Sequence, residues 1–428
     1  MRISMIEKIK VYGKQKANGK VHISGAKNAA LPLLAAALLS SDGMRLKNVP
    51  PLTDVTTMLA LLENLGITYQ VFKDSHYANS IKLKTDALEN FTAPYEIVKK
   101  MRASALVLGP LLSRLGRCRV SLPGGCAIGV RPIDLHLKGM EALGATIELR
   151  DGYVHASAPE GLRGAEFTFP IVTVTGTENV VMAAVLANGT TVLKNAAREP
   201  EVVDLANCLN KMGANISGHG TETVVIHGVT SLRSTEHTVV PDRIEAGTYA
   251  IAAGITNGRI DLLGGDFRKL LPSFLDKMEL AGLSFSSIDN GLRVESSGKI
   301  LPIDVDTEPF PGYPTDLQAQ CMAMLCLADG KSNIRENIWE NRFMHVAELM
   351  RMGADISVAG THAQVRGVKH LTAAPVMATD LRASFSLILA ALAADGDTVI
   401  DRVYHLDRGY CCVKEKFADC GIAIERIK

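Results

Sequence analysis

The stretch LANCLNKMGANIS (residues 205–217) combines a helix-like apolar pattern, a glycine and an alternating strand pattern, and this order of features occurs in six copies along the 428-residue chain. The copies are marked by glycines spaced 68 to 78 residues apart: Gly66, Gly144, Gly213, Gly282, Gly353 and Gly421. A glycine directly after an apolar helix is typical of a left-handed helix end. The alternation that follows is typical of a half-buried strand. The spacing therefore predicts an α/β chain of six similar units.

An Ala-rich apolar helix, a turn and a β-branched strand also recur, as in VVMAAVLANGTTVLKNA (180–196). Helices that are apolar on all sides are usually buried, so we expect these helices in the interior. Three units of this length make one domain-sized lobe, which predicts two lobes of three units. Pro241 interrupts a strand pattern in TVVPDRIEAG (238–247), where we expect a hinge. A cleft between two lobes is a common ligand site.

Charge and cysteine content exclude several classes of protein. The chain has 46 Lys and Arg against 45 Asp and Glu, a formal charge of +1, which argues against a nucleic-acid or anionic-membrane binder. Its eight cysteines include no C-x-x-C pair, so we expect no metal site, and their modest number predicts a reduced, cytoplasmic protein. The charged N-terminus and the longest apolar stretch (29–39) fit neither a signal peptide nor a membrane span.

The segment LPGGCAIGVRPIDLH (122–136) breaks the repeat and carries Cys126 among three glycines. Such a loop predicts an exposed cysteine, and the nearby Arg131 would tune its acidity. The alternative is a buried free cysteine in a tight turn. The segment matches neither a P-loop nor a dinucleotide-binding fingerprint.

Two further positions have a functional and a structural interpretation each. Lys27 and Asn28 enter an apolar helix, where a cation and an amide would face an anion, or where a solvated lysine precedes a capping asparagine. Asp316 stands just before an apolar helix in PFPGYPTDLQAQ (309–320), either as a helix cap or as a general base held by turns.

Four arginines lie in loops or at helix starts: Arg102, Arg342, Arg382 and Arg408. Arginine binds phosphate and carboxylate groups through two parallel hydrogen bonds, although a single arginine is more often a surface residue. Arg102 and Arg382 share an R-A-S helix start at corresponding places in the two lobes, for which repeat symmetry is an explanation that requires no function. Glu199, in NAAREPEVVD, is most simply a solvated residue before a helix.

These segments together resemble the UDP-N-acetylglucosamine 1-carboxyvinyltransferase family of enolpyruvyl transferases across essentially the whole chain. The most specific pieces are SGAKNAALP, MRAS, PGGCAIGVRPIDLH, REPEVVD, PDRIEAGT, PTDLQAQ, ENRFMH, ATDLRAS and YHLDRGY. The resemblance implies an inside-out α/β barrel with two lobes, each of three βαβαββ repeats, and an active site in the cleft between them. It assigns residues 27–240 to the lobe with the cysteine loop, and residues 1–26 and 241–428 to the second lobe.

The resemblance also implies the reaction and its partners. The enolpyruvyl group of phosphoenolpyruvate moves to the 3′-hydroxyl of UDP-N-acetylglucosamine with release of phosphate, which is the first committed step of peptidoglycan synthesis. The implied enzyme is a monomer and needs no metal or cofactor. Binding of the nucleotide sugar first, followed by closure of the lobes, would order the Cys126 loop.

By motif, the resemblance places Cys126, Asp316, Lys27 and Arg408 in catalysis. Cys126 is similar to the family's proton donor to phosphoenolpyruvate, and Asp316 to the group that takes the proton of the 3′-hydroxyl. The implied substrate contacts are Lys27, Asn28, Arg102, Arg131, Pro132, Ile133, Asp134, Leu135, Val172, Thr173, Val174, Asp316, Ile338, Arg342, Arg382 and Arg408.

One segment departs from the family pattern. Some relatives have Lys-Val-Ser-Val-Gly in the nucleotide loop, where this chain has IVTVT (171–175) and so lacks a phosphate-binding cation. Backbone N–H groups and the Thr173 hydroxyl remain as phosphate contacts. Because the loop cysteine is present rather than the aspartate of some relatives, alkylation of Cys126 by fosfomycin is expected.

Three alternatives stay open on the sequence. The sister enzyme 3-phosphoshikimate 1-carboxyvinyltransferase shares the six-unit fold but lacks the cysteine loop. A non-enzymatic UDP-sugar-binding regulator on the same scaffold would have lost the chemical residues, which are all present here. A redox-sensing cysteine protein would need a resolving thiol near Cys126, for which Cys118 is the candidate.

Overall fold

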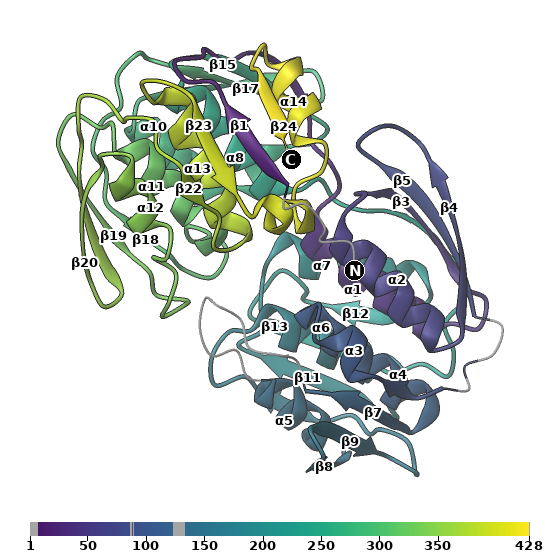
Figure 1. The fold of residues 1–428 in the computed structure, drawn as a ribbon. Helices are drawn as coiled ribbons and strands as arrows, with labels where there is room; N and C mark the ends of the chain where they lie inside the picture. Colours follow the sequence, from purple (N-terminus) through teal and green to yellow (C-terminus); the bar gives the residue numbers. More distant parts are fainter. Residues whose placement is uncertain (1–6, 86–87, 89, 123–132, 428) are drawn as a thin grey trace. The chain divides into compact units, whose positions relative to one another are not determined.

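The computed structural model of the chain describes residues 7–85, 88, 90–122 and 133–427. These residues divide into two compact units. Unit 1 consists of the described part of residues 1–24 and 241–428, and unit 2 of the described part of residues 25–125 and 131–240. Figure 1 shows the helices and strands of both units as ribbons.

Within the described residues the strands form six four-stranded sheets, three in each unit, and all six share one topology. The first strand pairs in parallel with the second, and the fourth lies antiparallel between the second and the third. In four repeats the first strand is followed in the chain by the first helix, and in all six a second helix follows the second strand. In the other two repeats the first strand (Glu236–Thr238 or Asn18–His22) and the first helix (Lys27–Ala36 or Arg243–Ile255) come from distant parts of the chain, but the order within the repeat is again β-α-β-α-β-β. The α/β class and the six similar units expected from the glycine spacing are thereby confirmed.

In unit 2 the repeats are β14 (Glu236–Thr238), α1 (Lys27–Ala36), β3 (Met44–Val49), α2 (Thr53–Asn64), β4 (Ile67–Lys73) and β5 (Asn79–Thr85); β6 (Thr92–Ala93), α4 (Leu108–Leu115), β7 (Arg117–Ser121), α5 (Asp134–Ala142), β8 (Thr146–Arg150) and β9 (Tyr153–Ser157); and β10 (Glu166–Thr168), α6 (Val174–Ala184), β11 (Thr190–Lys194), α7 (Pro200–Lys211), β12 (Asn215–Ser217) and β13 (Thr223–His227).

In unit 1 they are β2 (Asn18–His22), α8 (Arg243–Ile255), β15 (Arg259–Leu263), α10 (Pro272–Leu280), β16 (Leu283–Ile288) and β17 (Gly291–Ser296); β18 (Val305–Asp306), α11 (Gln318–Leu325), β19 (Lys331–Arg335), α12 (Val346–Arg351), β20 (Asp355–Ala359) and β21 (His362–Arg366); and β22 (Val376–Met377), α13 (Leu381–Ala393), β23 (Thr398–Asp401), α14 (Val413–Asp419), β24 (Ile424–Ile427) and β1 (Lys8–Val11).

Short helices complete the units: η1 (Ala37–Leu39), α3 (Tyr95–Val98), η2 (Arg102–Val107), α9 (Phe267–Leu270), η3 (Thr315–Leu317) and η4 (Val403–Arg408).

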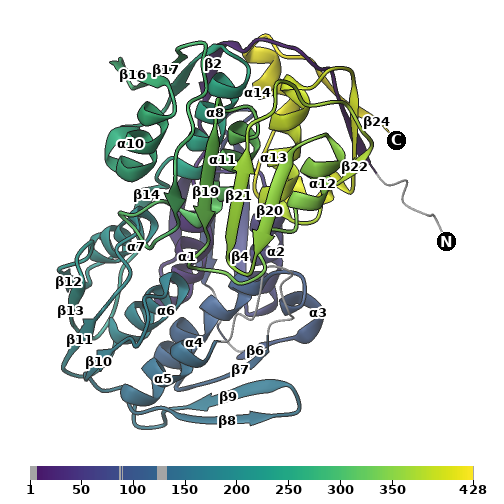
Figure 2. The same ribbon diagram turned by 90° about the vertical axis from the view of Figure 1, so that its left-hand side faces the viewer.

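The first helix of each repeat lies in the interior of its unit. All residues of α8 and α11 are buried, and α8, α11 and α13 contact one another. The strands β19, β21 and β20 lie over α11 (Figure 2). Alanine-rich sequence allows this close packing of helices, so the expected interior position is confirmed.

The six marker glycines end the second helix of each repeat in the left-handed region, with φ between 72° and 105°. A side chain in this conformation is strained, which explains why glycine recurs at the position. The predicted helix ends are therefore confirmed.

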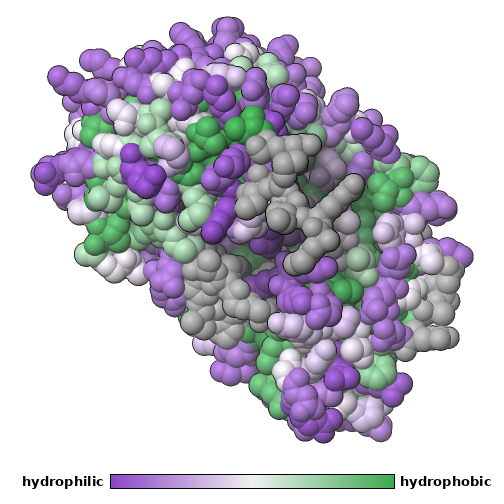
Figure 3. Space-filling model, viewed as in Figure 1, coloured by the Kyte–Doolittle hydropathy of each residue, from purple (hydrophilic) through white to green (hydrophobic). Residues whose placement is uncertain are grey.

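The surface of the face shown in Figure 3 is largely hydrophilic, with apolar side chains scattered between charged ones. No helix among the described residues is long and apolar enough to cross a membrane.

Candidate active site

The Asp316 carboxylate in unit 1 is held by two arginines from other segments. Asp316 lies in η3, just before the buried helix α11. Its Oδ1 accepts a hydrogen bond from Arg342 Nη2 and its Oδ2 one from Arg382 Nη2, each at 2.7 Å. Both arginine side chains are almost fully buried, and Asp316 is about a quarter exposed. A buried cluster of two cations and one anion leaves a net positive charge facing any ligand that reaches it.

This environment sets the ionisation of Asp316. Burial alone would raise the pKa of the carboxyl group, but Arg382 and Arg342 hold it well below its usual range. The carboxylate is therefore ionised at neutral pH. The interpretation of Asp316 as a helix cap is wrong, because neither η3 nor α11 has a side-chain cap.

Aromatic and amide side chains support Arg382. Its guanidinium carbon lies 5.4 Å from the centre of the Tyr410 ring. Gln320 Nε2 lies within hydrogen-bond distance of both Tyr410 Oη (3.1 Å) and the Asp316 carbonyl oxygen (2.9 Å). The sequence YHLDRGY thus brings Tyr410 next to the cluster. Arg408 is the last residue of η4, two residues before Tyr410.

In unit 2, Lys27 and Asn28 are the first two residues of α1. Lys27 Nζ lies 3.4 Å from Asp54 Oδ2 in the first turn of α2, and the lysine side chain is only 13% exposed. The interpretation as a solvated lysine beside a capping asparagine is wrong, because Ala26 occupies the cap position and α1 has no side-chain cap. A half-buried cation at a helix N-terminus suits an anionic ligand.

A second part of unit 2 brings together residues expected to bind the nucleotide sugar. Arg102 begins η2, and Asp134 and Leu135 begin α5 after Ile133. Burial and then the charge of Arg102 lower the pKa of His136 to about 3. His136, which directly follows Leu135, is therefore neutral, and Arg102 lies close enough to affect its ionisation.

The segment with Val172, Thr173 and Val174 lies at the start of α6, and its preceding residue Ile171 is 67% exposed. The Thr173 hydroxyl caps this helix by accepting a hydrogen bond from Gly176 N at 3.3 Å. Thr175 Oγ1 is 3.2 Å from His136 Nε2, which links the start of α6 to α5. The structure thus places the Arg102 region and the Thr173 segment on neighbouring elements of one unit.

Three of the predicted residues, Cys126, Arg131 and Pro132, lie outside the described residues. Cys118, the candidate resolving thiol, is buried, and burial raises its pKa to about 12, which removes it as a reactive partner. Glu199 is buried rather than solvated, a correction of the sequence interpretation. It lies close enough to raise the pKa of the buried Glu178, after burial itself and Glu201.

Two polar residues next to predicted ones were not found by sequence reasoning. Glu336 and Thr315 hold the segments around Ile338 and Asp316 through partly buried hydrogen bonds. Their only signal in the sequence is proximity to PTDLQAQ and ENRFMH, because their partners come from distant segments.

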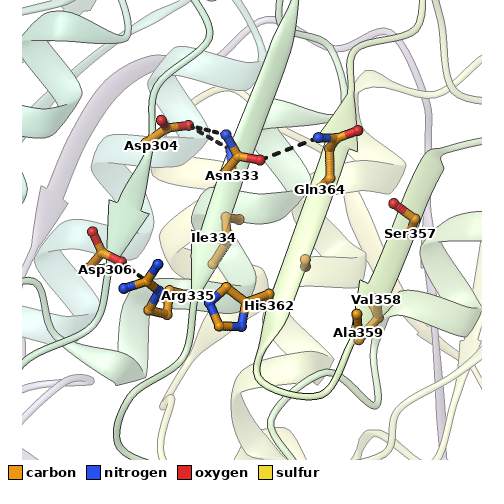
Figure 4. A pocket seen from close by; sticks show the side chains of 11 residues that line it. Asp304, Asp306, Asn333, Ile334, Arg335, Ser357, Val358, Ala359, His362 and Gln364 are labelled. Carbon is orange, nitrogen blue, oxygen red and sulfur yellow. Dashed lines mark hydrogen bonds and ion pairs between the residues drawn. The ribbon is translucent and has the colours of Figure 1, made fainter.

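A pocket with about 450 Å³ of space lies on the sheet of β18, β19, β21 and β20 in unit 1, away from the predicted residues (Figure 4). Several of its polar side chains pair with one another: Asp304 accepts from Asn333, and Asp306 pairs with Arg335 at 3.5 Å. No group of three or more potential metal ligands occurs among the residues that the structure describes.

Comparison with known proteins identifies the family. The family model described as EPSP synthase (3-phosphoshikimate 1-carboxyvinyltransferase) matches residues 11–417. A curated relative from Dinoroseobacter shibae, named UDP-N-acetylglucosamine 1-carboxyvinyltransferase, is 56% identical over 424 residues, which cover 99% of this chain and 100% of the relative. A relative of the same name from Agrobacterium fabrum is 54% identical over 429 residues, with the same coverage.

The chain belongs to the UDP-N-acetylglucosamine 1-carboxyvinyltransferase family. The family and the enzyme class expected from the motifs are thereby confirmed. Two solved structures share the fold. The enolpyruvyl transferase NikO from Streptomyces tendae has a TM-score of 0.86 at 24% identity, covering 98% of this chain and 99% of its own. EPSP synthase from Acinetobacter baumannii has a TM-score of 0.76 at 15% identity, covering 99% and 100%.

Proposed function

We propose that the protein transfers the enolpyruvyl group of phosphoenolpyruvate to the 3′-hydroxyl of UDP-N-acetylglucosamine and releases phosphate, the first committed step of peptidoglycan synthesis. The full-length identity to relatives named for this activity carries the proposal. The buried cluster of Asp316, Arg342 and Arg382 supports the choice of residues, because both substrates are anions.

Transfer proceeds by addition and elimination. A proton from Cys126 adds to the methylene carbon of phosphoenolpyruvate, which generates an oxocarbenium-like centre at the neighbouring carbon. The 3′-oxygen of the sugar bonds to that centre and gives its proton to Asp316. The Cys126 thiolate then takes a proton from the new methyl group, which expels phosphate, restores the double bond and regenerates the thiol. Lys27, Arg131 and Arg408 hold the phosphate and carboxylate groups.

The ionisation of Asp316 limits how it acts as a base. A carboxylate with so low a pKa accepts a proton poorly. The proposed role therefore requires that the substrates draw Arg342 or Arg382 away from the carboxylate, since loss of either ion pair raises its pKa. An anionic substrate supplies the competing partner for these guanidinium groups.

The remaining predicted contacts bind the acceptor. We assign Asn28 to the sugar, and Arg102, residues 131–135, Val172–Val174 and Ile338 to the nucleotide-sugar pocket. Because Ile171 replaces a cation, Thr173 and backbone N–H groups carry the phosphate contacts of that segment. Fosfomycin alkylates Cys126. We further propose the inside-out barrel architecture, the lobes 27–240 and 1–26 with 241–428, a monomeric state and a cytoplasmic location.

A coupled phosphate-release assay with each acceptor tests the function. We expect release with phosphoenolpyruvate and UDP-N-acetylglucosamine, and none with shikimate 3-phosphate. The reverse result would overturn the proposal in favour of the sister enzyme, and no turnover with either acceptor would favour the non-enzymatic regulator.

Asp316→Asn should lower kcat by about 10²- to 10⁴-fold, the usual contribution of a general base. Asp261 provides a matched control in the same unit, because it forms a similar two-point pair with Arg293, at 2.7 and 2.9 Å, on the sheet of β15 and β17. Asp261→Asn should leave kcat unchanged. Equal losses in the two variants would remove Asp316 from the mechanism.

A further inference from the structure

Glu336 is a buried carboxylate directly after β19 that closes the next turn of the chain. It is 1% exposed. Its Oε1 accepts hydrogen bonds from the backbone N–H groups of Ile338 (3.0 Å) and Trp339 (3.2 Å). This side chain therefore holds the segment that carries Ile338, together with two hydrogen bonds between Asn337 and Thr307.

The same carboxylate joins two further segments. Thr307, just after β18, donates its hydroxyl to Glu336 Oε1 at 2.9 Å. Thr315, in η3, lies with Oγ1 at 2.9 Å from both carboxylate oxygens. A buried carboxylate that loses such donors leaves a desolvated charge, which costs more than an ordinary hydrogen bond. The end of β18, η3 and the segment after β19 are thus tied to one point.

Thr315 links Glu336 to the arginine cluster. A hydroxyl has one hydrogen to donate and lone pairs that accept. Since Glu336 takes the hydrogen, Thr315 Oγ1 is left to accept from Arg342 Nη1, at 3.1 Å. The other terminal nitrogen of Arg342 donates to Asp316 at 2.7 Å. Both ends of the guanidinium are therefore fixed, one by Asp316 and one by the Thr315–Glu336 pair.

We propose that Glu336 is a positioning residue of the transfer reaction, which sets the orientation of Arg342 through the Thr315 hydroxyl and fixes the turn that carries Asp316. This inference rests on the proposed function. Glu336 does not touch the reacting atoms. Its effect falls on kcat, because the orientation of Arg342 governs how readily it leaves Asp316 when substrate binds.

Four variants test the chain of contacts. Thr315→Val removes the hydroxyl at nearly constant shape, and Thr315→Ser keeps it. Glu336→Gln removes the charge. Thr256→Val is the matched control, because it deletes a buried hydroxyl at the end of α8 that bonds to two backbone groups, the Ala252 carbonyl and the Ala17 N–H. Thr315→Val and Glu336→Gln should each lower kcat by about 10- to 100-fold, the loss expected for one hydrogen bond to a charged group.

The KM for phosphoenolpyruvate should stay within about twofold of the parent value in these variants, and Thr315→Ser should restore most of kcat. The combined loss in the double variant Thr315→Val/Glu336→Gln should be smaller than the product of the single losses, because both act through one contact. Thr256→Val should leave kcat unchanged even if it lowers the melting temperature.

A measurement that needs no turnover separates this inference from the proposed function. Side-chain ¹⁵N NMR of Arg342 should show slow exchange of its terminal nitrogens in the parent and in Thr315→Ser, and faster averaging in Thr315→Val. If the parent releases no phosphate, the proposed function fails and the NMR comparison alone decides the role of Thr315 and Glu336. Unchanged Arg342 signals in Thr315→Val, fully multiplicative losses, or kcat within twofold of the parent in both single variants would overturn the inference.

Discussion

The side chains at Asp316 show how a buried charge is tolerated in this chain. Transfer of an isolated carboxylate from water into the interior costs several kcal/mol. Here two arginines satisfy both oxygens, and the other end of Arg342 donates to the Thr315 hydroxyl, which is itself bonded to the Glu336 carboxylate. The ion pairs therefore stabilise the buried carboxylate, and the arginines remain suited to exchange Asp316 for the phosphate or carboxylate of a ligand.

Cysteine chemistry gives a prediction at the same scale. Most described cysteines are buried, and burial raises the pKa of the thiols of Cys208, Cys321 and Cys326 to about 12. Cys412 is partly exposed, and a hydrogen bond from the Cys411 thiol lowers its pKa to about 7. Because the thiolate is the nucleophile, a brief iodoacetamide treatment at pH 7 should modify Cys412 first among the described cysteines.

Fosfomycin, in contrast, should modify Cys126, because its phosphonate needs the cations of the substrate site. Peptide mass spectrometry after treatment with fosfomycin and then iodoacetamide distinguishes the two adducts. The Cys412→Ser variant should lose the iodoacetamide adduct at residue 412 and keep the fosfomycin adduct on Cys126. If iodoacetamide modified a buried cysteine before Cys412, the predicted reactivity of Cys412 would be wrong. If the peptide with Cys126 carried no fosfomycin adduct, the predicted alkylation of Cys126 would be wrong.

The motifs predict Asp316, Arg342 and Arg382 as site residues, but they do not predict that these side chains contact one another. Contacts of this kind join positions separated by 26 and 66 residues, and no local pattern specifies such a pair. The same reason hid Thr315 and Glu336, whose residue types are common in any turn. Glu199 was misassigned because a glutamate before a helix is usually solvated, and only tertiary packing buries it here.

At the scale of elements, His136 joins α5 to α6. Its Nδ1 lies 3.0 Å from Asn179 Nδ2, and its Nε2 lies 3.2 Å from Thr175 Oγ1. The neutral ring therefore accepts a hydrogen bond from the Asn179 amide within α6 and donates one to the Thr175 hydroxyl at the start of the same helix. Asn179 also donates to the Ala105 carbonyl in η2. One uncharged imidazole thus helps to hold together three elements of unit 2 that carry predicted nucleotide-sugar contacts.

The stability of this arrangement should fall in mild acid. Burial and Arg102 lower the pKa of His136 to about 3, against about 6.5 in the unfolded chain. The unfolded state therefore binds the proton more readily. The stabilisation is fully present above pH 6.5 and is lost as the pH falls from 6.5 towards 3. By pH 5 the loss in unfolding free energy should be about 2 kcal/mol.

Urea unfolding at pH 7 and pH 5 measures this loss. His136→Gln, whose amide offers one donor and one acceptor, should reduce the difference between the two pH values by about 2 kcal/mol. His227→Gln, at an exposed position on β13, is the control and should leave the difference unchanged. An identical pH dependence in the parent and His136→Gln would show that His136 is not buried in its neutral form.

Elements were predictable where the local sequence decides them. The inner helices follow from long apolar runs, and the helix ends from glycines that alone accept a positive φ without strain. The two-residue strands β6, β18 and β22 were not predictable, because they are too short for alternation and exist through pairing with a neighbouring strand.

At the scale of the whole chain, the near-zero net charge and the anionic substrates are compatible because cations such as Arg342 and Arg382 are concentrated at one place and paired with few carboxylates. The repeat count followed from the spacing of the glycines alone. The position of the N-terminal strands did not, because β1 and β2 join two different sheets of unit 1. No pattern within residues 8–22 specifies those partners.

That arrangement predicts that the chain tolerates circular permutation. In five sheets the third and fourth strands are consecutive in the chain, whereas in the sheet of β22 and β23 the fourth strand is the N-terminal β1. β1 lies antiparallel to β24, with Lys8 opposite Ile427. Joining residue 428 to residue 1 would therefore create the same hairpin that the other five repeats possess, with residues 428 and 1–7 as the connection.

New ends placed between Asp151 and Gly152, in the exposed turn that joins β8 to β9, interrupt no buried backbone. We expect this permutant to fold with an unfolding free energy within about 2 kcal/mol of the parent, and to release phosphate with a similar kcat, because the contacts of every sheet are preserved. Urea unfolding and the phosphate assay measure both. A permutant opened within the wholly buried α8 is the control and should not fold. A parent chain cleaved between Asp151 and Gly152 shows whether the break itself is tolerated. If that cleaved chain stays folded but the Asp151–Gly152 permutant does not fold, the repeat of β22, β23, β24 and β1 requires separate chain ends. The six sheets would then not be equivalent folding units.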